Sequence, residues 1–573
     1  MEKKNIVKLS YVALLIITLI SFYMASGANI TESSPIWKEL GVWTLIPPLL
    51  AIILAFLTKN VIVSLAAGVF SGSMLVTLAT KSENIIFVVN DAFTNTISTM
   101  VNSMADGWNA GILLQVMAIG GLISLVTAMG GTQAIAERLA SMANSVRSSQ
   151  FVTWILGLFV FFDDYANSLI VGPIMRPVTD KQRISREKLS FIIDATAAPI
   201  AGIALVSTWI GYELSLIHAE LPDLPFATSS YALFLETIPY RFYNIFILAF
   251  IVLSIVLLKE FGPMYAAEKR ARTTGKVIAD GSTPMAVEDN MDIESVTQMA
   301  SNIWNAIIPI GTLIVVSLVS FYTNGYATLE GETLAKIQAA PFSMYAIRTC
   351  YSSSDASVVL FLSAVLGGLV AIVMGLAQRL FSLKKAIDIW IAGWKSMIIT
   401  VVILLFAWSI ADIIKNQLDA DMFLATTLGD SLPAFIIPAI IFLLGSIISF
   451  ATGTSYGTMG ILMPLAIPLA NTVSSGDPNL IVSAIAAVLT GAIFGDHCSP
   501  ISDTTILSSM GSACDHIDHV RTQILYAVVV AIVAVVFGFI PSGLGVSPLF
   551  TLPAGILALF IILSIFGKKV TQA

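Results

Sequence analysis

Charged side chains are scarce in this sequence. Only 11% of its 573 residues are Asp, Glu, Lys or Arg, whereas 57% are hydrophobic. A soluble domain carries roughly 25% charged residues, so this chain has too few polar groups to cover a folded surface in water. The surplus apolar surface must face a lipid bilayer, and the sequence predicts an all-α integral membrane protein.

Cysteine and histidine are also few, which removes several classes of site. Three cysteines without a CxxC spacing exclude a disulfide framework. Four histidines without an HExxH motif argue against a zinc hydrolase. A net charge of −7 and the lack of a basic domain exclude nucleic acid as a partner. We therefore expect neither a cofactor nor nucleic-acid binding.

Long hydrophobic segments are plentiful instead. A helix of about 20 apolar residues crosses the hydrocarbon core, and we predict about 12 transmembrane helices. Two further apolar stretches, 151–175 and 434–470, are interrupted by polar or small residues and are predicted to be re-entrant hairpins. The predicted spans are 11–27, 43–58, 61–79, 108–129, 189–213, 240–258, 303–322, 356–378, 396–414, 480–510, 522–541 and 549–567.

The basic residues orient these spans. With a cytoplasmic N-terminus, all but six of the 29 Lys and Arg residues fall in cytoplasmic segments, as the positive-inside rule requires. Segment 11–27 lacks a clear cleavage site and further spans follow it, so we expect an uncleaved first span. We expect a multi-pass protein of the cytoplasmic (inner) membrane with both termini in the cytoplasm. The six exceptions are Lys38, Lys81, Arg241, Lys336, Arg348 and Lys415.

The two halves of the chain repeat each other. Each half holds five spans and one hairpin, and an odd number of crossings inverts the second copy. Inverted repeats with broken helices near the midplane recur in secondary transporters. The matches are Gly107-Trp108 with Gly393-Trp394, Leu139-Ala140 with Leu424-Ala425, Phe162 with Phe450 (an offset of 288), Pro173 and Pro177 with Pro464 and Pro468, and Asp194 to Pro199 with Asp496 to Pro500.

These repeats define the expected domains. The stretch between them is polar, with Gly275, Gly281 and Pro284, and we interpret it as a plain cytoplasmic linker. The predicted divisions are an N-terminal extra span at 1–42, inverted repeat one at 43–258, the linker at 259–300, inverted repeat two at 301–541 and a C-terminal extra span at 542–573.

Carboxylates inside the membrane mark the candidate site, because a charged group in a span is costly and is a functional hypothesis by default. Pro199 and Pro500 break their helices and free backbone carbonyls beside these carboxylates. Such an all-oxygen set suits a hard cation, so the same carboxylates are expected to bind Na⁺ or H⁺. The candidate ion- or substrate-binding residues are Asp163, Asp164, Asn167, Asp194, Thr196, Thr452, Thr454, Ser455, Asp496, His497, Ser499, Ser502, Asp503, Thr504 and Thr505.

Some polar residues have an ordinary structural alternative. Ser and Thr in spans often donate to the carbonyl four residues earlier, which describes Thr196 equally well. Asp412 is expected at the membrane interface. The run from Asp515 to His519 resembles a metal cluster but is expected to be a solvated cytoplasmic turn. His497, flanked by two site candidates, is a candidate proton carrier near neutral pH.

Three motifs carry a family resemblance. The run from Gly495 to Thr505 closely resembles the signature of NhaC-type Na⁺/H⁺ antiporters, members of an ion transporter superfamily. The runs from Phe161 to Asn167 and from Asp194 to Pro199 resemble the matching motifs of the first half. The resemblance covers roughly 40–541. It implies a scaffold domain and a moving, elevator-like transport domain, made here by the two hairpins with 189–213 and 480–510.

Na⁺/H⁺ antiport is the leading hypothesis, with Na⁺ and H⁺ as transported ions and no enzymatic activity. The hydroxyl-rich tip from Thr452 to Ser455 leaves open a Na⁺- or H⁺-coupled transporter or exchanger of a small organic acid or amino acid. An intramembrane aspartyl protease is a minor alternative, because Ile493 stands where that family has a glycine. Expected partners are the lipid bilayer, Na⁺, H⁺, a small carboxylate or amino acid under the second hypothesis, and a second copy in a homodimer.

Overall fold

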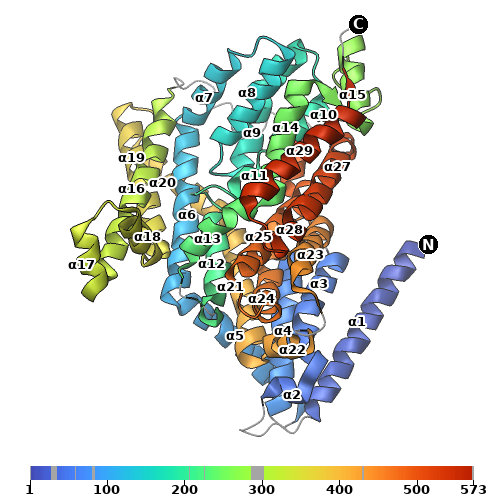
Figure 1. The fold of residues 1–573 in the computed structure, drawn as a ribbon, viewed down its shortest axis with the longest axis vertical. Coiled ribbons are helices and arrows are strands. Elements are labelled where there is room, and N and C mark those ends of the chain that lie inside the picture. Colours follow the sequence, from blue (N-terminus) through green and yellow to red (C-terminus); the bar gives the residue numbers. More distant parts are fainter. Residues whose placement is uncertain are drawn as a thin grey trace.

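Helices make up nearly all of the protein (Figure 1). In this computed structural model, eleven helices of the described part of the chain are long and apolar enough to cross a membrane, or twelve if one bent pair counts as a span. The prediction of an all-α membrane protein with about 12 spans is confirmed. The structure describes residues 2–27, 35–58, 60–80, 84–205, 207–224, 226, 228–284, 302–428 and 432–570.

The first half runs from single helices to a hairpin and then to a broken helix. Side-chain caps determine where several helices begin. For example, Asp106 accepts a hydrogen bond from the Asn109 N–H at 2.9 Å. The helices are α1 (Glu2–Ser26), α2 (Ile36–Leu40), α3 (Ile46–Thr58), α4 (Val61–Thr80), α5 (Ile85–Ala105), α6 (Gly107–Ala128), α7 (Gly131–Ala140), α8 (Val146–Phe159), α9 (Asp164–Lys181), α10 (Arg186–Asp194), α11 (Ala198–Ala201), α12 (Ile210–Glu220), α13 (Ser230–Thr237) and α14 (Phe242–Leu257).

The second half repeats this order of hairpin and broken helix. Strands β1 (Lys259–Glu260) and β2 (Lys568–Lys569) pair antiparallel. They join the segment after α14 to the segment after the last helix, α29 (Pro548–Phe566). The inversion of the second copy stays a prediction. The helices are α15 (Gly262–Thr274), α16 (Trp304–Thr328), α17 (Gly331–Ala339), α18 (Met344–Ser352), α19 (Ala356–Ala377), α20 (Leu383–Ser396), α21 (Ile398–Asp412), α22 (Ala420–Leu428), α23 (Ile437–Thr452), α24 (Ser455–Val473), α25 (Pro478–His497), α26 (Asp503–Ser512), α27 (His516–Val533), α28 (Ile540–Gly543) and α29 (Pro548–Phe566).

Two amphipathic helices, α5 and α20, lie where the sequence predicts loops. Each precedes a long span, α6 or α21, at a matching place in its half. Their apolar residues occupy one face, so no long apolar run reveals them. On α5 the side chains of Phe87, Phe93 and Ile97 are exposed, as expected of a face that contacts lipid.

The predicted spans 189–213 and 480–510 are not continuous helices. The first is divided into α10, α11 and α12, and the second into α25 and α26. Pro199 is the second residue of α11, where a missing N–H is tolerated, and Pro500 lies between α25 and α26. Both predicted helix breaks are therefore present.

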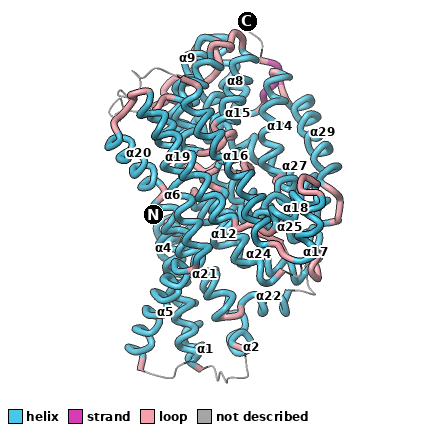
Figure 2. The backbone as a smooth tube through the Cα atoms, turned by 90° about the vertical axis from the view of Figure 1, so that its left-hand side faces the viewer, coloured by secondary structure: helices cyan, strands magenta, loops and turns pink. Residues whose placement is uncertain are grey.

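Four long helices form a bundle at one side of the molecule, where α6, α16, α19 and α20 pack against one another (Figures 1 and 2). Glycines let α6 and α20 approach closely, because a Cβ at Gly120 would lie 2.7 Å from the Gly393 carbonyl oxygen. We call these four helices the side bundle. The hairpins and broken helices pack together on the other side of α6.

The segment predicted as a plain linker is folded over its first part. Helix α15 packs on α10 and α27, the Ser185 N–H donates to Glu268 Oε1 at 2.7 Å, and the Thr283 N–H donates to Asp515 Oδ2 at 2.9 Å. Burial raises the pKa of Asp515, but hydrogen bonds from Thr283 and from N–H groups of α27 outweigh it and lower that pKa below its ordinary value. The linker interpretation is wrong for 259–284, and 285–301 lies outside the described residues.

Candidate functional site

The tips of the two hairpins are built alike. In hairpin one (α8 and α9) the Asp163 carboxylate accepts a hydrogen bond from the Ala166 N–H at 2.7 Å. In hairpin two (α23 and α24) the Thr454 hydroxyl accepts one from the Gly457 N–H at 3.4 Å. Each side chain caps the N-terminus of the second arm and so lies at the hairpin tip.

These caps correct the register of the repeat. The first residues of α9 and α24 correspond at an offset of 291, which pairs Asp164-Tyr165 with Ser455-Tyr456 and equals the offset of the proline pairs. The match of Phe162 with Phe450 at 288 is wrong in structural terms. Phe162 lies in the turn before α9, whereas Phe450 still belongs to α23.

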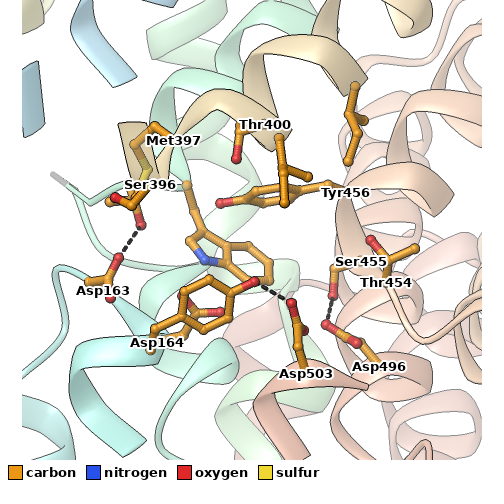
Figure 3. Close-up of a pocket in the computed structure, with 15 residues that line it drawn as sticks. Asp163, Asp164, Ser396, Met397, Thr400, Thr454, Ser455, Tyr456, Asp496 and Asp503 are labelled. Atoms are coloured by element: carbon orange, nitrogen blue, oxygen red, sulfur yellow. Dashed lines mark hydrogen bonds between the residues drawn. The ribbon is translucent and has the colours of Figure 1, made fainter. Parts of the chain in front are cut away.

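A small cavity of about 120 Å³ lies where both hairpin tips meet the broken helix of the second half (Figure 3). Four carboxylates line it, and helix α21 with the end of α20 closes its far wall. None of the lining residues is Lys or Arg. The lining residues are Asp163, Asp164, Tyr165, Thr208, Trp209, Ser396, Met397, Ile399, Thr400, Ile403, Thr454, Ser455, Tyr456, Asp496 and Asp503.

Hydrogen bonds join each hairpin tip to the second broken helix. Ser455 Oγ donates to Asp496 Oδ2 at 2.8 Å, and the Tyr165 hydroxyl donates to Asp503 Oδ2 (Figure 3). The other carboxylate oxygen of Asp496 is buried and finds no hydrogen-bond partner among the described residues. A buried acceptor of this kind has capacity for a bound cation or a proton.

The remaining predicted hydroxyl and amide residues do not line the cavity. Most of their polar atoms bind backbone or one another, which is the structural alternative considered for Thr196. The partners are Gly157 O and Thr196 O for Asn167, Ile192 O for Thr196, Ile448 O for Thr452, Phe450 O for Ser499, Thr504 for Ser502 and His497 O for Thr505. Ser502 also hydrogen-bonds Asp496, and Asn167 Oδ1 is buried without a partner among the described residues.

Asp194 and His497 lie in a second buried cluster beside the cavity. Its other members, His519 and Gln523, come from α27 and were not predicted. His519 has no exposed surface and its Nε2 lies 3.0 Å from Asp194 Oδ2. The expected solvated turn is thus wrong for His519, because α27 begins at His516 and turns this side chain inward. His519 and Gln523 are four residues apart, which places both side chains on one helix face. This spacing is the sequence signal that could have identified them.

Polar side chains brace the two helix breaks. Asn244 of α14 donates to Pro199 O at 2.8 Å, and His516 Nε2 lies 2.8 Å from Pro500 O. Arg241 donates to Gly202 O at 3.1 Å and pairs with Glu213 at 2.8 Å. Arg241, one of the six basic residues expected on the outer side, stands at the start of α14 and is fully buried together with Glu213. An arginine paired inside the protein does not report membrane topology.

The family assignment follows from the whole chain. The sequence profile of the Na⁺/H⁺ antiporter family matches residues 3–203 and 200–541. The chain belongs to the Na⁺/H⁺ antiporter family. The resemblance read from the three motifs is therefore confirmed.

The chain is similar to curated proteins and to solved structures. An uncharacterized protein of Haemophilus influenzae is 33% identical over 539 residues, which are 92% of this chain and 96% of that protein. The malate-2H⁺/Na⁺-lactate antiporter of Bacillus subtilis is 40% identical over 102 residues, 17% of this chain and 21% of that protein. The solved YdaH transporter of Alcanivorax borkumensis is 13% identical, with a TM-score of 0.46, over 88% of this chain and 98% of its own.

The cavity carboxylates are not part of a metal cluster among the described residues. Within the described ranges, no group of three or more His, Cys, Asp or Glu side chains is arranged to hold a metal ion. Asp496 with Ser455 and Asp503 with Tyr165 instead form carboxylate–hydroxyl pairs. Binding of Na⁺ by these carboxylates stays a prediction.

Close glycine contact between hairpin one and α26 gives a first test. A Cβ at Gly172 would lie 2.5 Å from the Gly511 backbone, so Gly172→Ala is expected to destabilise the protein by about 1–3 kcal/mol through overpacking. Thermal unfolding in detergent should show a lower Tm. Gly311→Ala is the control, because nothing lies within 4 Å of its added Cβ. Equal Tm values for the two variants would show that the hairpin does not pack on α26 in this way.

Proposed function

We propose that this family member exchanges Na⁺ for H⁺ across the cytoplasmic membrane as a secondary active antiporter. The observation that carries the proposal is the cavity with four carboxylates and no basic lining residue. Oxygen ligands suit a hard cation, and a cavity of about 120 Å³ leaves room for a cation with some of its water. The cation would be held by Asp496 or Asp503 with nearby hydroxyl and backbone oxygens.

A second polar cavity supports a route to this site. It has a volume of about 440 Å³ and lies further along α21, which supplies Ile403 to the first cavity, and along α12, which follows Trp209. Asp106, Glu220 and Asp412 line it together with Lys415, which pairs with Glu220 at 3.6 Å. The remaining negative charge raises the local cation concentration. Under the proposed orientation, with both termini cytoplasmic, this cavity opens on the outer side.

We further propose that the hairpins and broken helices move as one unit against the side bundle in an elevator-like manner. Direct hydrogen bonds tie both tips to α25 and α26, whereas the side bundle reaches the cavity only through the end of α20. A homodimer is part of this proposal, because a moving unit needs a fixed partner surface. We propose no catalytic activity, since each of Asp496 and Asp503 is engaged by a tip hydroxyl.

Transport of a small organic acid is the second candidate. The 40% identity over 102 residues to the malate-2H⁺/Na⁺-lactate antiporter favours it, and so do the hydroxyls of Thr454 and Ser455 at the cavity. Four carboxylates oppose a free anion there by like-charge repulsion. An organic acid would therefore enter only with protons or Na⁺.

Everted membrane vesicles carrying the protein separate these candidates. Addition of Na⁺ to vesicles with an acid interior is expected to dissipate the pH gradient, which a pH-sensitive dye reports. Equimolar K⁺ should leave the gradient unchanged, and malate or lactate should add nothing to the Na⁺ response. No Na⁺ response between about pH 6.5 and 9 would refute Na⁺/H⁺ exchange, and a response that requires the acids would favour the second candidate.

A further inference from the structure

The cluster of Asp194, His497, His519 and Gln523 joins both broken helices to α27, and all four side chains are fully buried. Asp194 Oδ2 lies 3.0 Å from His519 Nε2, 2.8 Å from Gln523 Nε2 and 3.6 Å from His497 Nδ1. None of the four lines the carboxylate cavity. The cluster is thus a separate group of titratable side chains.

Charge compensation in this cluster depends on protons. A buried carboxylate must be paired or protonated, and in the part of the chain that the structure describes neither Lys nor Arg pairs with Asp194. The counter-charge within hydrogen-bond distance is a proton on His519, whose Nε2 lies 3.0 Å from Asp194 Oδ2. One added proton makes the group neutral, and its loss leaves one negative charge.

The cluster also has unused hydrogen-bonding capacity. A purely structural network normally satisfies its buried polar atoms. Here several buried atoms have no partner among the described residues, so a proton can be gained or passed on without breaking the existing contacts. These atoms are Asp194 Oδ1, His497 Nε2, His519 Nδ1, Gln523 Oε1 and the Tyr243 hydroxyl.

Asp496 connects this cluster to the cavity, because it precedes His497 and faces the opposite way, towards Ser455. Its negative charge favours a proton in the cluster, and a cation bound beside it removes that effect. The other titratable groups that face the cluster are Tyr243 of α14, Cys498 after α25 and His516 of α27.

We propose that Asp194 and His519 form a proton-binding site separate from the cation cavity, and that a cation bound beside Asp496 releases a proton from it. The N–H bond of an imidazolium breaks, its electron pair stays on the ring nitrogen and the proton passes to water. One Na⁺ thereby replaces one H⁺. The proton site stands on the cluster alone, whereas the coupling rests on the proposed Na⁺/H⁺ exchange.

Histidine titration tests the proton site. The chain has four histidines, so ¹⁵N-histidine NMR of the full-length protein in nanodiscs gives four ring signals, assigned by one His→Gln variant each. The His519 signal is expected to change protonation between about pH 5 and 10, with a midpoint lowered by about one pH unit or more in Asp194→Asn. Asp477→Asn, at the far end of α25, is the control. A His519 ring that keeps one protonation state throughout, or that does not respond to Asp194→Asn, overturns the proton site.

Proton release tests the coupling. Na⁺ is added to purified protein in weak buffer with a pH dye, and choline serves as the control. Asp194→Asn and His519→Gln, which retains a donor towards Asp194, are each expected to release about one proton fewer per Na⁺ bound. Because coupled binding is reciprocal, the Kd for ²²Na⁺ in each variant should also depend less steeply on pH than in wild type. Equal release in variants and wild type overturns the coupling. Absence of release in wild type refutes Na⁺/H⁺ exchange itself, and the histidine titration still decides the proton site.

Discussion

Asp496→Asn is expected to reduce Na⁺-driven proton exchange at least about 100-fold. The substitution keeps the shape and the contact with Ser455 but removes one charge from the cavity. A unit charge about 4 Å from a cation contributes about 4 kcal/mol at an effective dielectric constant of 20. A loss of about 2.8 kcal/mol is enough for a 100-fold weaker site. The measurement is the Na⁺ concentration that half-dissipates the pH gradient in everted vesicles.

Asp477→Asn is the matched control for this substitution. Asp477 caps the start of the same helix, α25, by accepting a hydrogen bond from the Asn479 N–H at 3.0 Å. Asparagine caps helices as well as aspartate does, so exchange should remain within about twofold of wild type. Wild-type Na⁺ dependence in Asp496→Asn would remove Asp496 from the site and leave Asp503 as the carboxylate to test.

Local sequence signals suffice for much of this architecture. A proline or an Asp beside small residues inside an apolar run is unusual for a continuous span, so the breaks at Pro199 and Pro500 and the tip at Asp163 could be predicted. Helices α5 and α20 could not be predicted from apolar length, because an amphipathic helix spreads its apolar residues over one face. The charge count includes Arg241, although a basic residue paired inside the protein carries no information on topology.

The site itself depends on contacts between distant parts of the chain. Tyr165 and Asp503 are 338 residues apart and yet hydrogen-bonded, and Asp194 meets His519 across 325 residues. No local sequence pattern around either residue of a pair identifies the residue that it contacts. Ser396 and Thr400 line the cavity from the junction of α20 and α21, and the sequence there reads only as the start of a span. Tertiary packing, which one sequence does not reveal, selects these residues.

Arg241→Met is expected to cause the largest loss of stability, about 3–5 kcal/mol, because it leaves Glu213 buried without its counter-charge. Thermal unfolding in detergent measures it as a lower Tm. The matched control is Arg348→Met. Arg348 pairs with Glu236 at 3.3 Å, but the two side chains are 77% and 46% exposed, so its loss should cost at most about 1 kcal/mol. A Tm for Arg241→Met no lower than that of Arg348→Met would contradict the buried pair.

The double variant Arg241→Met/Glu213→Gln distinguishes the effect of the unpaired Glu213 charge from the effect of the lost hydrogen bond at the helix break. Removing both charges together is often close to neutral for a buried pair, so the double variant should regain most of the lost Tm if the unpaired charge is the cause. Arg241 also donates to Gly202 O at the end of α11, and this bond stays broken in both variants. A double variant as unstable as Arg241→Met would therefore assign the loss to the helix break. In that case exchange should fall as well, because α11 leads into Thr208 and Trp209 at the cavity.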